Sequence, residues 1–317
     1  MEIVVLDGHT LNPGDLSWDD LRALGNVTVF DRTNDDMVVE RALNADIVLT
    51  NKTIVNRSSI MSLPSLKYIG IIATGYNIVD IGAAAERGIP VCNVRGYGTG
   101  SVAQHAFSLL LELTNRCGAH SQSVKQGGWH KANDFCYWEG PMVELDGKVL
   151  GIIGLGTIGR KTAAIGLGFG MEVIAYHTHP EDPMEGVGFR ELETLFRTSD
   201  VISLHCPLTD NNQNMINENS LQIMKSTAFL INTARGGLID HDALARALGD
   251  GQIAGAGLDV FTIEPPRNEH PLFTMDNCLI TPHHSWATKE ARQRLMKGVV
   301  DNVKVFISGK VQNAVNL

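Results

Sequence analysis

A glycine-rich turn between an apolar strand and a helix constrains the fold of this 317-residue chain more than any other feature. The turn, GLGTIG, follows VLGII and opens the helical segment RKTAAIGLGFG. Its first glycine permits a tight turn, its second lets a pyrophosphate approach the backbone, and its third lets the helix pack on the strand. The helix N-terminus then offers N–H groups and partial positive charge to phosphate. A turn without a ligand is the alternative, but the flanking strand and helix favour a dinucleotide site formed by Gly154, Leu155, Gly156, Thr157, Ile158 and Gly159.

Short apolar runs alternate with helical patterns along the whole chain, which indicates parallel sheets with helices on both faces. Two series of such runs occur, which predicts two α/β units. The first series is 3–7, 27–30, 46–50, 68–74 and 91–94, and the second is 148–156, 171–176, 200–207, 228–234, 253–260 and 278–283.

Two long helices are expected to join the units, one from 101 to about 126 and one from 289 to 310. The simplest organisation is a substrate domain of residues 1–100 and 288–317 into which a nucleotide domain, 101–287, is inserted. Residues 127–147 have no regular period and are rich in aromatics, which predicts an extended connection at an oligomer interface.

Composition excludes several classes of protein. A net charge of -9 and a pI near 5.6 argue against a nucleic-acid surface. No apolar run approaches the roughly 18 residues of a membrane span, and the N-terminus shows no signal peptide. Five scattered cysteines suit free thiols in a reducing cytoplasm. We therefore expect a cytoplasmic enzyme that binds neither nucleic acid nor membrane.

Polar residues at the ends of the second series of strands suggest catalysis, because ligands bind beyond the carboxyl ends of parallel strands. Arg235 follows one strand directly, and its planar guanidinium suits a carboxylate. His283 ends another strand and Glu264 follows a third, and a histidine beside a carboxylate can act as a general acid. Each residue alone could be structural, but together they predict a catalytic set.

Several motifs in one order make the chain similar to the D-isomer-specific 2-hydroxyacid dehydrogenases. They are ATGYN (73–77), SVAQH (101–105), GIIGLGTIG (151–159), HCPLT (205–209), INTARGG (231–237), GLDVF (257–261) with EPP, and TPHHSWAT (281–288). ATGYN, SVAQH and DFCYW (134–138) with HSWAT most resemble the glycerate dehydrogenase or hydroxypyruvate reductase branch. The resemblance implies two Rossmann-like, doubly wound parallel-sheet α/β domains and the reduction of a small 2-oxoacid, such as hydroxypyruvate or glyoxylate, to the D-2-hydroxyacid.

The resemblance also implies roles for the catalytic set. Arg235 would anchor the substrate carboxylate, His283 would exchange a proton with the substrate oxygen, and Glu264 would keep His283 charged and oriented. Backbone N–H groups of Thr74, Gly75 and Tyr76 would hold the other side of the carboxylate, and Trp286 would shape the pocket. Relatives of the hydroxypyruvate reductase type line that pocket with a tryptophan from a partner subunit, and Trp138 lies in the comparable loop. A homodimer is therefore expected.

The cofactor expected is NAD, with NADP possible. Beyond the glycine turn, we expect it to contact His177, Thr178, Cys206, Pro207, Thr209, Thr233, Ala234, Asp259 and Ser285. Position 177 usually holds an acid that binds the ribose hydroxyls and repels a 2′-phosphate. His177 removes that repulsion, and Thr178 and His179 could also accept a phosphate, but no arginine or lysine follows. Arg160, after the third glycine, is either a phosphate ligand or a helix-surface residue.

Other interpretations remain open. Asp259 either faces the nicotinamide or caps the sheet end. Gln104 and His105 are interpreted as helix packing. A metal site at His284 or at His177 and His179 is not expected, since neither has a cysteine or carboxylate at ligand spacing. The alternative functions are a phosphoglycerate dehydrogenase, which would need basic groups for its phosphate and often carries a further domain not expected here, and an NAD(H)-sensing binding protein.

Overall fold

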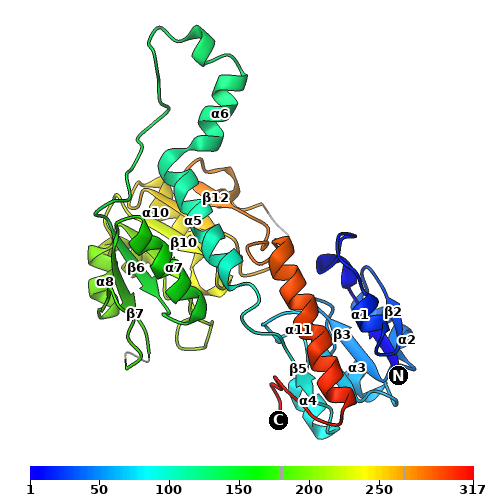
Figure 1. Cartoon of the computed structure of the whole chain (residues 1–317). Coiled ribbons are helices and arrows are strands. Elements are labelled where there is room, and N and C mark those ends of the chain that lie inside the picture. Colours follow the sequence, from blue (N-terminus) through cyan, green and yellow to red (C-terminus); the bar gives the residue numbers. More distant parts are fainter. Residues whose placement is uncertain (179–180, 267–268) are drawn as a thin grey trace. The chain divides into compact units, whose positions relative to one another are not determined.

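The structure is a computed structural model that describes residues 1–178, 181–266 and 269–317. The chain divides into two compact units (Figure 1). Unit 1 comprises residues 1–98 and 287–317, and unit 2 comprises residues 99–286.

Unit 1 is built on a five-stranded parallel sheet of order β2-β1-β3-β4-β5. Every residue of β3 and β4 is buried, which explains why their sequences are apolar apart from Thr50. The strands are β1 (Glu2–Val5), β2 (Asn26–Val29), β3 (Ile47–Thr50), β4 (Tyr68–Ile71) and β5 (Val91–Cys92). The helices are α1 (Asp19–Arg22), α2 (Val38–Ala42), α3 (Arg57–Met61), α4 (Ile81–Glu86) and α11 (Lys289–Ile307).

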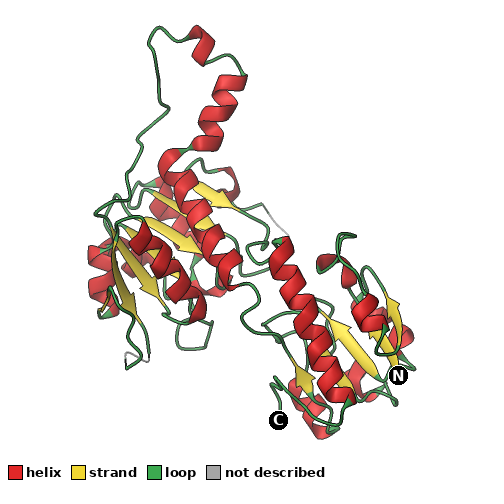
Figure 2. Ribbon diagram, viewed as in Figure 1, coloured by secondary structure: helices red, strands yellow, loops and turns green. Residues whose placement is uncertain are grey.

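Unit 2 contains a seven-stranded parallel sheet of order β12-β11-β10-β9-β6-β7-β8 (Figure 2). The chain order reverses between β6 and β9, so these strand ends form the crevice where ligands of such sheets bind. The strands are β6 (Val149–Ile153), β7 (Glu172–Tyr176), β8 (Val187–Phe189), β9 (Val201–Leu204), β10 (Phe229–Asn232), β11 (Gly255–Leu258) and β12 (Cys278–Ile280). The helices are α5 (Thr99–Asn115), α6 (Cys117–Lys125), α7 (Thr157–Gly168), α8 (Leu192–Thr198), α9 (Glu218–Ile223) and α10 (His241–Gly249).

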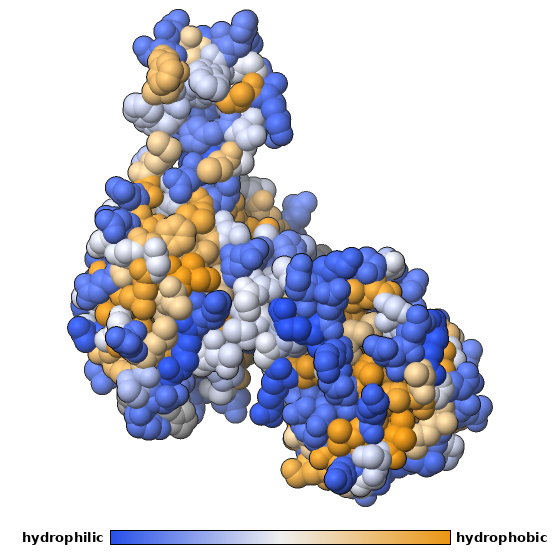
Figure 3. All heavy atoms as spheres, viewed as in Figure 1, coloured by the Kyte–Doolittle hydropathy of each residue, from blue (hydrophilic) through white to orange (hydrophobic). Residues whose placement is uncertain are grey.

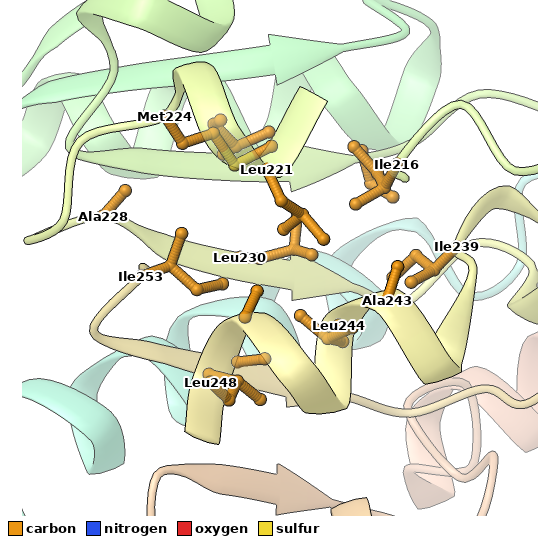
Figure 4. Packing of buried hydrophobic residues seen from close by; sticks show 14 of the residues in the cluster. Ile216, Leu221, Met224, Ala228, Leu230, Ile239, Ala243, Leu244, Leu248 and Ile253 are labelled. Atoms are coloured by element: carbon orange, nitrogen blue, oxygen red, sulfur yellow. The ribbon is translucent and has the colours of Figure 1, made fainter. Parts of the chain in front are cut away.

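Helices cover both faces of the unit 2 sheet. On one face, Leu221 of α9 and Leu244 of α10 pack against Leu230 of β10 (Figure 4). On the other, Phe107 of α5 and Ala163 of α7 belong to a second core cluster with the sheet. The two doubly wound parallel-sheet domains expected from the sequence are thereby confirmed. No helix in the described ranges is long and apolar enough to cross a membrane.

Two local expectations were wrong. The edge strand β8 was not foreseen, because it is only three half-buried residues long. The single helix expected over 101–126 is broken at Arg116, whose backbone is left-handed at φ 51°. The Glu112 carboxylate accepts the N–H of Gly118 at 3.0 Å, and Arg116 donates to the carbonyl of Glu139 at 2.7 Å. These contacts redirect the chain into a projection from unit 2, residues 116–142, which we call the arm (Figure 1).

Candidate active site

His283 and Glu264 meet at the carboxyl edge of the unit 2 sheet. His283 Nδ1 lies 2.5 Å from Glu264 Oε2, and the two side chains are 29% and 31% exposed. The backbone of His283 is left-handed at φ 51°, and its N–H donates to the carbonyl of Thr281 at 3.0 Å. Because Nδ1 faces the carboxylate, Nε2 is the ring nitrogen left for another partner. A general acid and the group that orients it need a contact of this kind.

The segment after Arg235 packs directly against the backbone at Phe261, three residues before Glu264. A Cβ on Gly236 would lie 2.0 Å from the carbonyl carbon of Phe261, so only glycine fits there. The N–H of Phe261 donates to Glu264 Oε1 at 2.8 Å, which ties the same segment to the carboxylate. The side chain of Asn232 binds the N–H of Ala234 and the carbonyl of Arg235, each at 2.9 Å. Arg235 itself is exposed.

Asp259 is fully buried and holds the loop that carries His283. Its Oδ1 accepts the Thr281 hydroxyl at 2.7 Å and the His284 N–H at 3.0 Å, and its Oδ2 accepts the Ser285 N–H at 2.9 Å. The interpretation of Asp259 as a structural acid at the sheet end therefore matches its contacts, and facing the nicotinamide remains a proposal.

His105 extends this network from α5. Its Nε2 lies 2.9 Å from Thr281 Oγ1. Since the Thr281 hydroxyl proton goes to Asp259, His105 must be the donor in this contact. Burial lowers the pKa of His105, with Asp259 opposing the shift, which favours the neutral ring. Its interpretation as a helix-packing residue was incomplete.

His284 also has neighbours that spacing along the sequence did not show. His105, Asp259 and His284 present ligand atoms within 4.8 Å of one another. The expectation that His284 lacks a nearby carboxylate was wrong, because Asp259 arrives from another strand. Both Asp259 oxygens already accept hydrogen bonds, so the contacts of this cluster are those of a hydrogen-bond network.

The glycine turn has the space that a dinucleotide requires. Gly154 has φ 97°, and a Cβ there would lie 2.6 Å from the Cys206 nitrogen. A Cβ on Gly159 would lie 2.1 Å from the carbonyl oxygen of Gly154, whereas a Cβ on Gly156 would meet nothing within 4 Å. The buried hydroxyl of Thr233 has no hydrogen-bond partner in the described part of the chain, which suits a site completed by a ligand.

A pocket of about 560 Å³ lies in front of this turn. Its lining is Thr99, Leu155, Gly156, Thr157, Arg160, Lys161, Ala164, His177 and Asp182. The basic groups near His177 thus come from α7 rather than from the residues after β7. Thr178 is exposed, and His179 lies outside the described residues.

The segment from Cys206 to Thr209 follows β9 and is organised by a residue that sequence reasoning missed. Asn212 accepts the Thr209 N–H at 2.7 Å and donates to the carbonyl of Pro207 at 2.8 Å. Nothing in the motif itself indicated this role, although asparagine is a frequent turn residue.

In unit 1, Thr74, Gly75 and Tyr76 follow β4. The Asn51 side chain donates to the carbonyl of Ile72 and the Asn93 side chain to that of Thr74, both at 2.6 Å. The Thr74 hydroxyl donates to the carbonyl of Val94 at 2.9 Å. These contacts hold the segment in one conformation. In unit 2, Trp286 donates from its indole to the carbonyl of His283 at 3.0 Å.

A doubly wound sheet with a dinucleotide turn, and a histidine–carboxylate pair at neighbouring strand ends, define a nucleotide-dependent oxidoreductase. Residues 107–285 match the model of the D-isomer specific 2-hydroxyacid dehydrogenase, NAD binding domain. The chain belongs to this family and is an NAD-binding dehydrogenase, as expected.

Two relatives of stated activity match most or all of the chain. It is 46% identical to a hydroxypyruvate reductase of Blautia hydrogenotrophica over 100% of both chains, and 43% identical to a glycerate dehydrogenase of Methylorubrum extorquens over 88% of each. A D-lactate dehydrogenase of Aquifex aeolicus, solved with NAD and lactic acid, matches 100% of this chain and 99% of its own at TM-score 0.84 and 29% identity. An acyclic imino acid reductase solved with NADPH and D-Arg matches 99% and 100% at TM-score 0.87 and 29% identity.

Proposed function

We propose that this enzyme reduces hydroxypyruvate, and more slowly glyoxylate, to the corresponding D-2-hydroxyacid. The observation that carries the substrate choice is the 46% identity to a hydroxypyruvate reductase along the full length of both chains. The contact between His283 and Glu264 supports the chemistry.

The residues of unit 2 account for the proton in this reaction. A bound reduced nicotinamide supplies a hydride to the carbonyl carbon of the substrate. His283 donates a proton from Nε2 to the carbonyl oxygen, while Glu264 holds Nδ1–H and stabilises the imidazolium before transfer. In the reverse direction, neutral His283 removes the hydroxyl proton.

Arg235 binds the substrate carboxylate in this proposal, because an exposed guanidinium can form two parallel hydrogen bonds to it. The N–H groups of Thr74, Gly75 and Tyr76 in unit 1 are further proposed carboxylate ligands, and Trp286 in unit 2 is a proposed pocket residue. Residues 99–286 then serve the nucleotide, and residues 1–98 with 287–317 serve the substrate.

The nucleotide is held by the turn from Gly154 to Gly159 and by residues at the strand ends. Gly156 and the N-terminus of α7 would hold the pyrophosphate, because a Cβ on Gly156 would meet open space. The other contacts proposed are His177, Thr178, Cys206, Pro207, Thr209, Thr233, Ala234, Asp259 and Ser285.

We also propose a homodimer formed through the arm. Phe135 is 90% exposed and Trp138 is 64% exposed, although both are large and apolar. At the base of the arm, a groove of about 510 Å³ is lined by Leu111, Asn115, Met142, Val143, Glu144, Leu145, Asp146 and Phe169. Figure 3 shows apolar surface over this side of unit 2. Exposed apolar surface of this kind marks interfaces, and a second copy would present the same arm and the same groove.

We also propose that the enzyme lies in the cytoplasm, because its five free cysteines suit a reducing compartment.

The test is the initial rate of NADH oxidation with hydroxypyruvate, glyoxylate, pyruvate and 3-phosphohydroxypyruvate. We expect kcat/KM to be highest with hydroxypyruvate by at least about tenfold, a difference of about 1.4 kcal/mol. A preference for the phosphorylated substrate would replace the proposal with a phosphoglycerate dehydrogenase. Tight NADH binding without turnover of any of the four would indicate a sensor.

A further inference from the structure

We propose that Asp182 is the cofactor-selecting acid of this enzyme and favours NAD(H) over NADP(H). The usual acid at the end of the second strand is absent, since His177 follows β7. Asp182 stands five positions later in the chain, in the segment between β7 and β8, and lines the same pocket as His177. Of the two measurements that test this inference, only kcat/KM depends on the proposed substrate. Nucleotide binding does not.

Arg160 holds Asp182 at that pocket. Arg160 Nη2 lies 2.6 Å from Asp182 Oδ2 and donates to the carbonyl of Asp182 at 2.5 Å. Its Nη1 donates to the carbonyl of Pro183 at 3.2 Å. The Arg160 side chain is 28% exposed, whereas that of Asp182 is 75% exposed. The half-buried guanidinium of Arg160, on the first turn of α7, thus binds the Asp182 side chain and the backbone carbonyls of Asp182 and Pro183.

The position of the pocket would let the Asp182 carboxylate bind a ribose hydroxyl of the nucleotide. The same pocket is lined by Gly156 and Thr157, where the glycine turn meets α7. In nucleotide sites of this type, the adenosine ribose lies between this turn and the end of the second strand. A carboxylate has only acceptor oxygens, so it suits two ribose hydroxyls, which are donors.

The charges around the pocket favour a hydroxyl over a phosphate at the ribose 2′ position. Arg160 is paired with Asp182, which leaves Lys161 as the other cation among the lining residues. A 2′-phosphate would meet the Asp182 carboxylate as a like charge. It could recruit Arg160 only by breaking the pair that holds Asp182 in place. Structural neighbours do not decide this choice, because they include one complex with NAD and one with NADPH.

The experiment compares Asp182→Asn with the parent enzyme. The dissociation constants of NADH and NADPH are measured by fluorescence titration without substrate, and kcat/KM for each is measured with hydroxypyruvate. We expect the parent to prefer NADH by at least about tenfold, and D182N to lose most of that preference by gaining affinity for NADPH, because the repulsion is removed and Arg160 is released to the phosphate. Arg160→Gln added to D182N should abolish the gain.

Glu185→Gln is the matched control. Glu185 is an exposed acid in the same segment that does not line the pocket, and its substitution changes the net charge equally. A parent enzyme that binds NADPH better than NADH would overturn the proposal. So would a D182N enzyme whose ratio of dissociation constants matches that of E185Q. A failure of hydroxypyruvate turnover would contradict the proposed substrate. The role of Asp182 would still be decided by the dissociation constants, because these are measured without substrate.

Discussion

His283 reaches Glu264 because its backbone adopts a left-handed conformation that few non-glycine residues tolerate. Asp259 holds the residues on both sides of it, through the Thr281 hydroxyl and the N–H groups of His284 and Ser285. The unusual backbone of the proposed general acid is therefore stabilised by one buried carboxylate. The chemistry depends as much on this loop as on the imidazole.

Substitutions at the pair should separate proton transfer from orientation. We expect His283→Gln to lower kcat by about 10³-fold or more, because no group then donates the proton, and Glu264→Gln to lower it by about 10²-fold. Stopped-flow measurement of hydride transfer checks both values. The dissociation constant of NADH should stay within about twofold of the parent value. An H283Q enzyme with parental kcat would refute the assignment of the general acid.

His105 should act as a positioning residue. His105→Leu removes the donor to Thr281 and is expected to lower kcat about tenfold, with little change in the KM for NADH. His105→Gln retains a donor at a similar reach and should restore activity to within about threefold of the parent. Equal losses in the two variants, with equal thermal stability, would show that the hydrogen bond does not matter.

Strand-end position led to the proposal of Arg235, Glu264 and His283, because parallel strands present their carboxyl ends at one edge of the sheet. It gave no indication of the positions of His105 or Asp182. His105 meets Thr281 across a sequence separation of 176 residues, and Asp182 reaches the pocket through an arginine on another element. Contacts of this kind leave no local pattern in the sequence.

In the turn between β6 and α7, we expect Gly159 to be required for folding and Gly156 only for nucleotide binding. Gly159→Ala forces a Cβ against the Gly154 carbonyl, so we expect a loss of about 3 kcal/mol of unfolding free energy. Gly156→Ala meets open space, so it should fold like the parent but bind NADH at least about tenfold more weakly. Urea unfolding and NADH titration check the pair. Equal destabilisation by both substitutions would contradict this separation.

His241, the first residue of α10, should make stability depend on pH. Burial, assisted by His270, lowers its pKa from 6.5 to about 4, and its ring stacks on Phe261 at 4.2 Å. The unfolded state takes up a proton near pH 6.5 and the folded state does not. Stability is therefore complete above pH 6.5 and falls as the pH drops toward 4, by about 2 kcal/mol at pH 5. Urea midpoints at pH 7.5 and pH 5 should show this loss in the parent and a smaller one in His241→Phe; identical losses would exclude His241 as the cause.

The elements themselves were predictable where burial is continuous. The predicted runs 46–50, 68–74, 200–207 and 228–234 contain β3, β4, β9 and β10 with one to four extra residues each. Prediction failed where the determinants are single contacts. The α5–α6 break depends on the Glu112 side chain and on Arg116, and neither interrupts a helical pattern.

At the scale of the whole molecule, the arm should determine the oligomeric state. Replacing Phe135 and Trp138 together by glutamate should convert a dimer into a monomer, because charge at an apolar contact must be desolvated. Light scattering after size exclusion measures the mass. Met61→Glu, at an apolar residue of unit 1 that is 43% exposed, is the control and should remain dimeric. A monomeric parent would contradict the dimer directly.

Unit 1 is assembled from both ends of the chain, and its β5 edge is completed by the C-terminal tail. The N–H of Val315 donates to the carbonyl of Val91 at 2.9 Å, and Asn316 binds the N–H of Val91 and the carbonyl of Ile89. Unit 2 is one continuous segment. During synthesis, residues 99–286 leave the ribosome before the last part of unit 1 does. Unit 2 can therefore fold while unit 1 still lacks α11, and unit 1, although begun first, is the last to be finished.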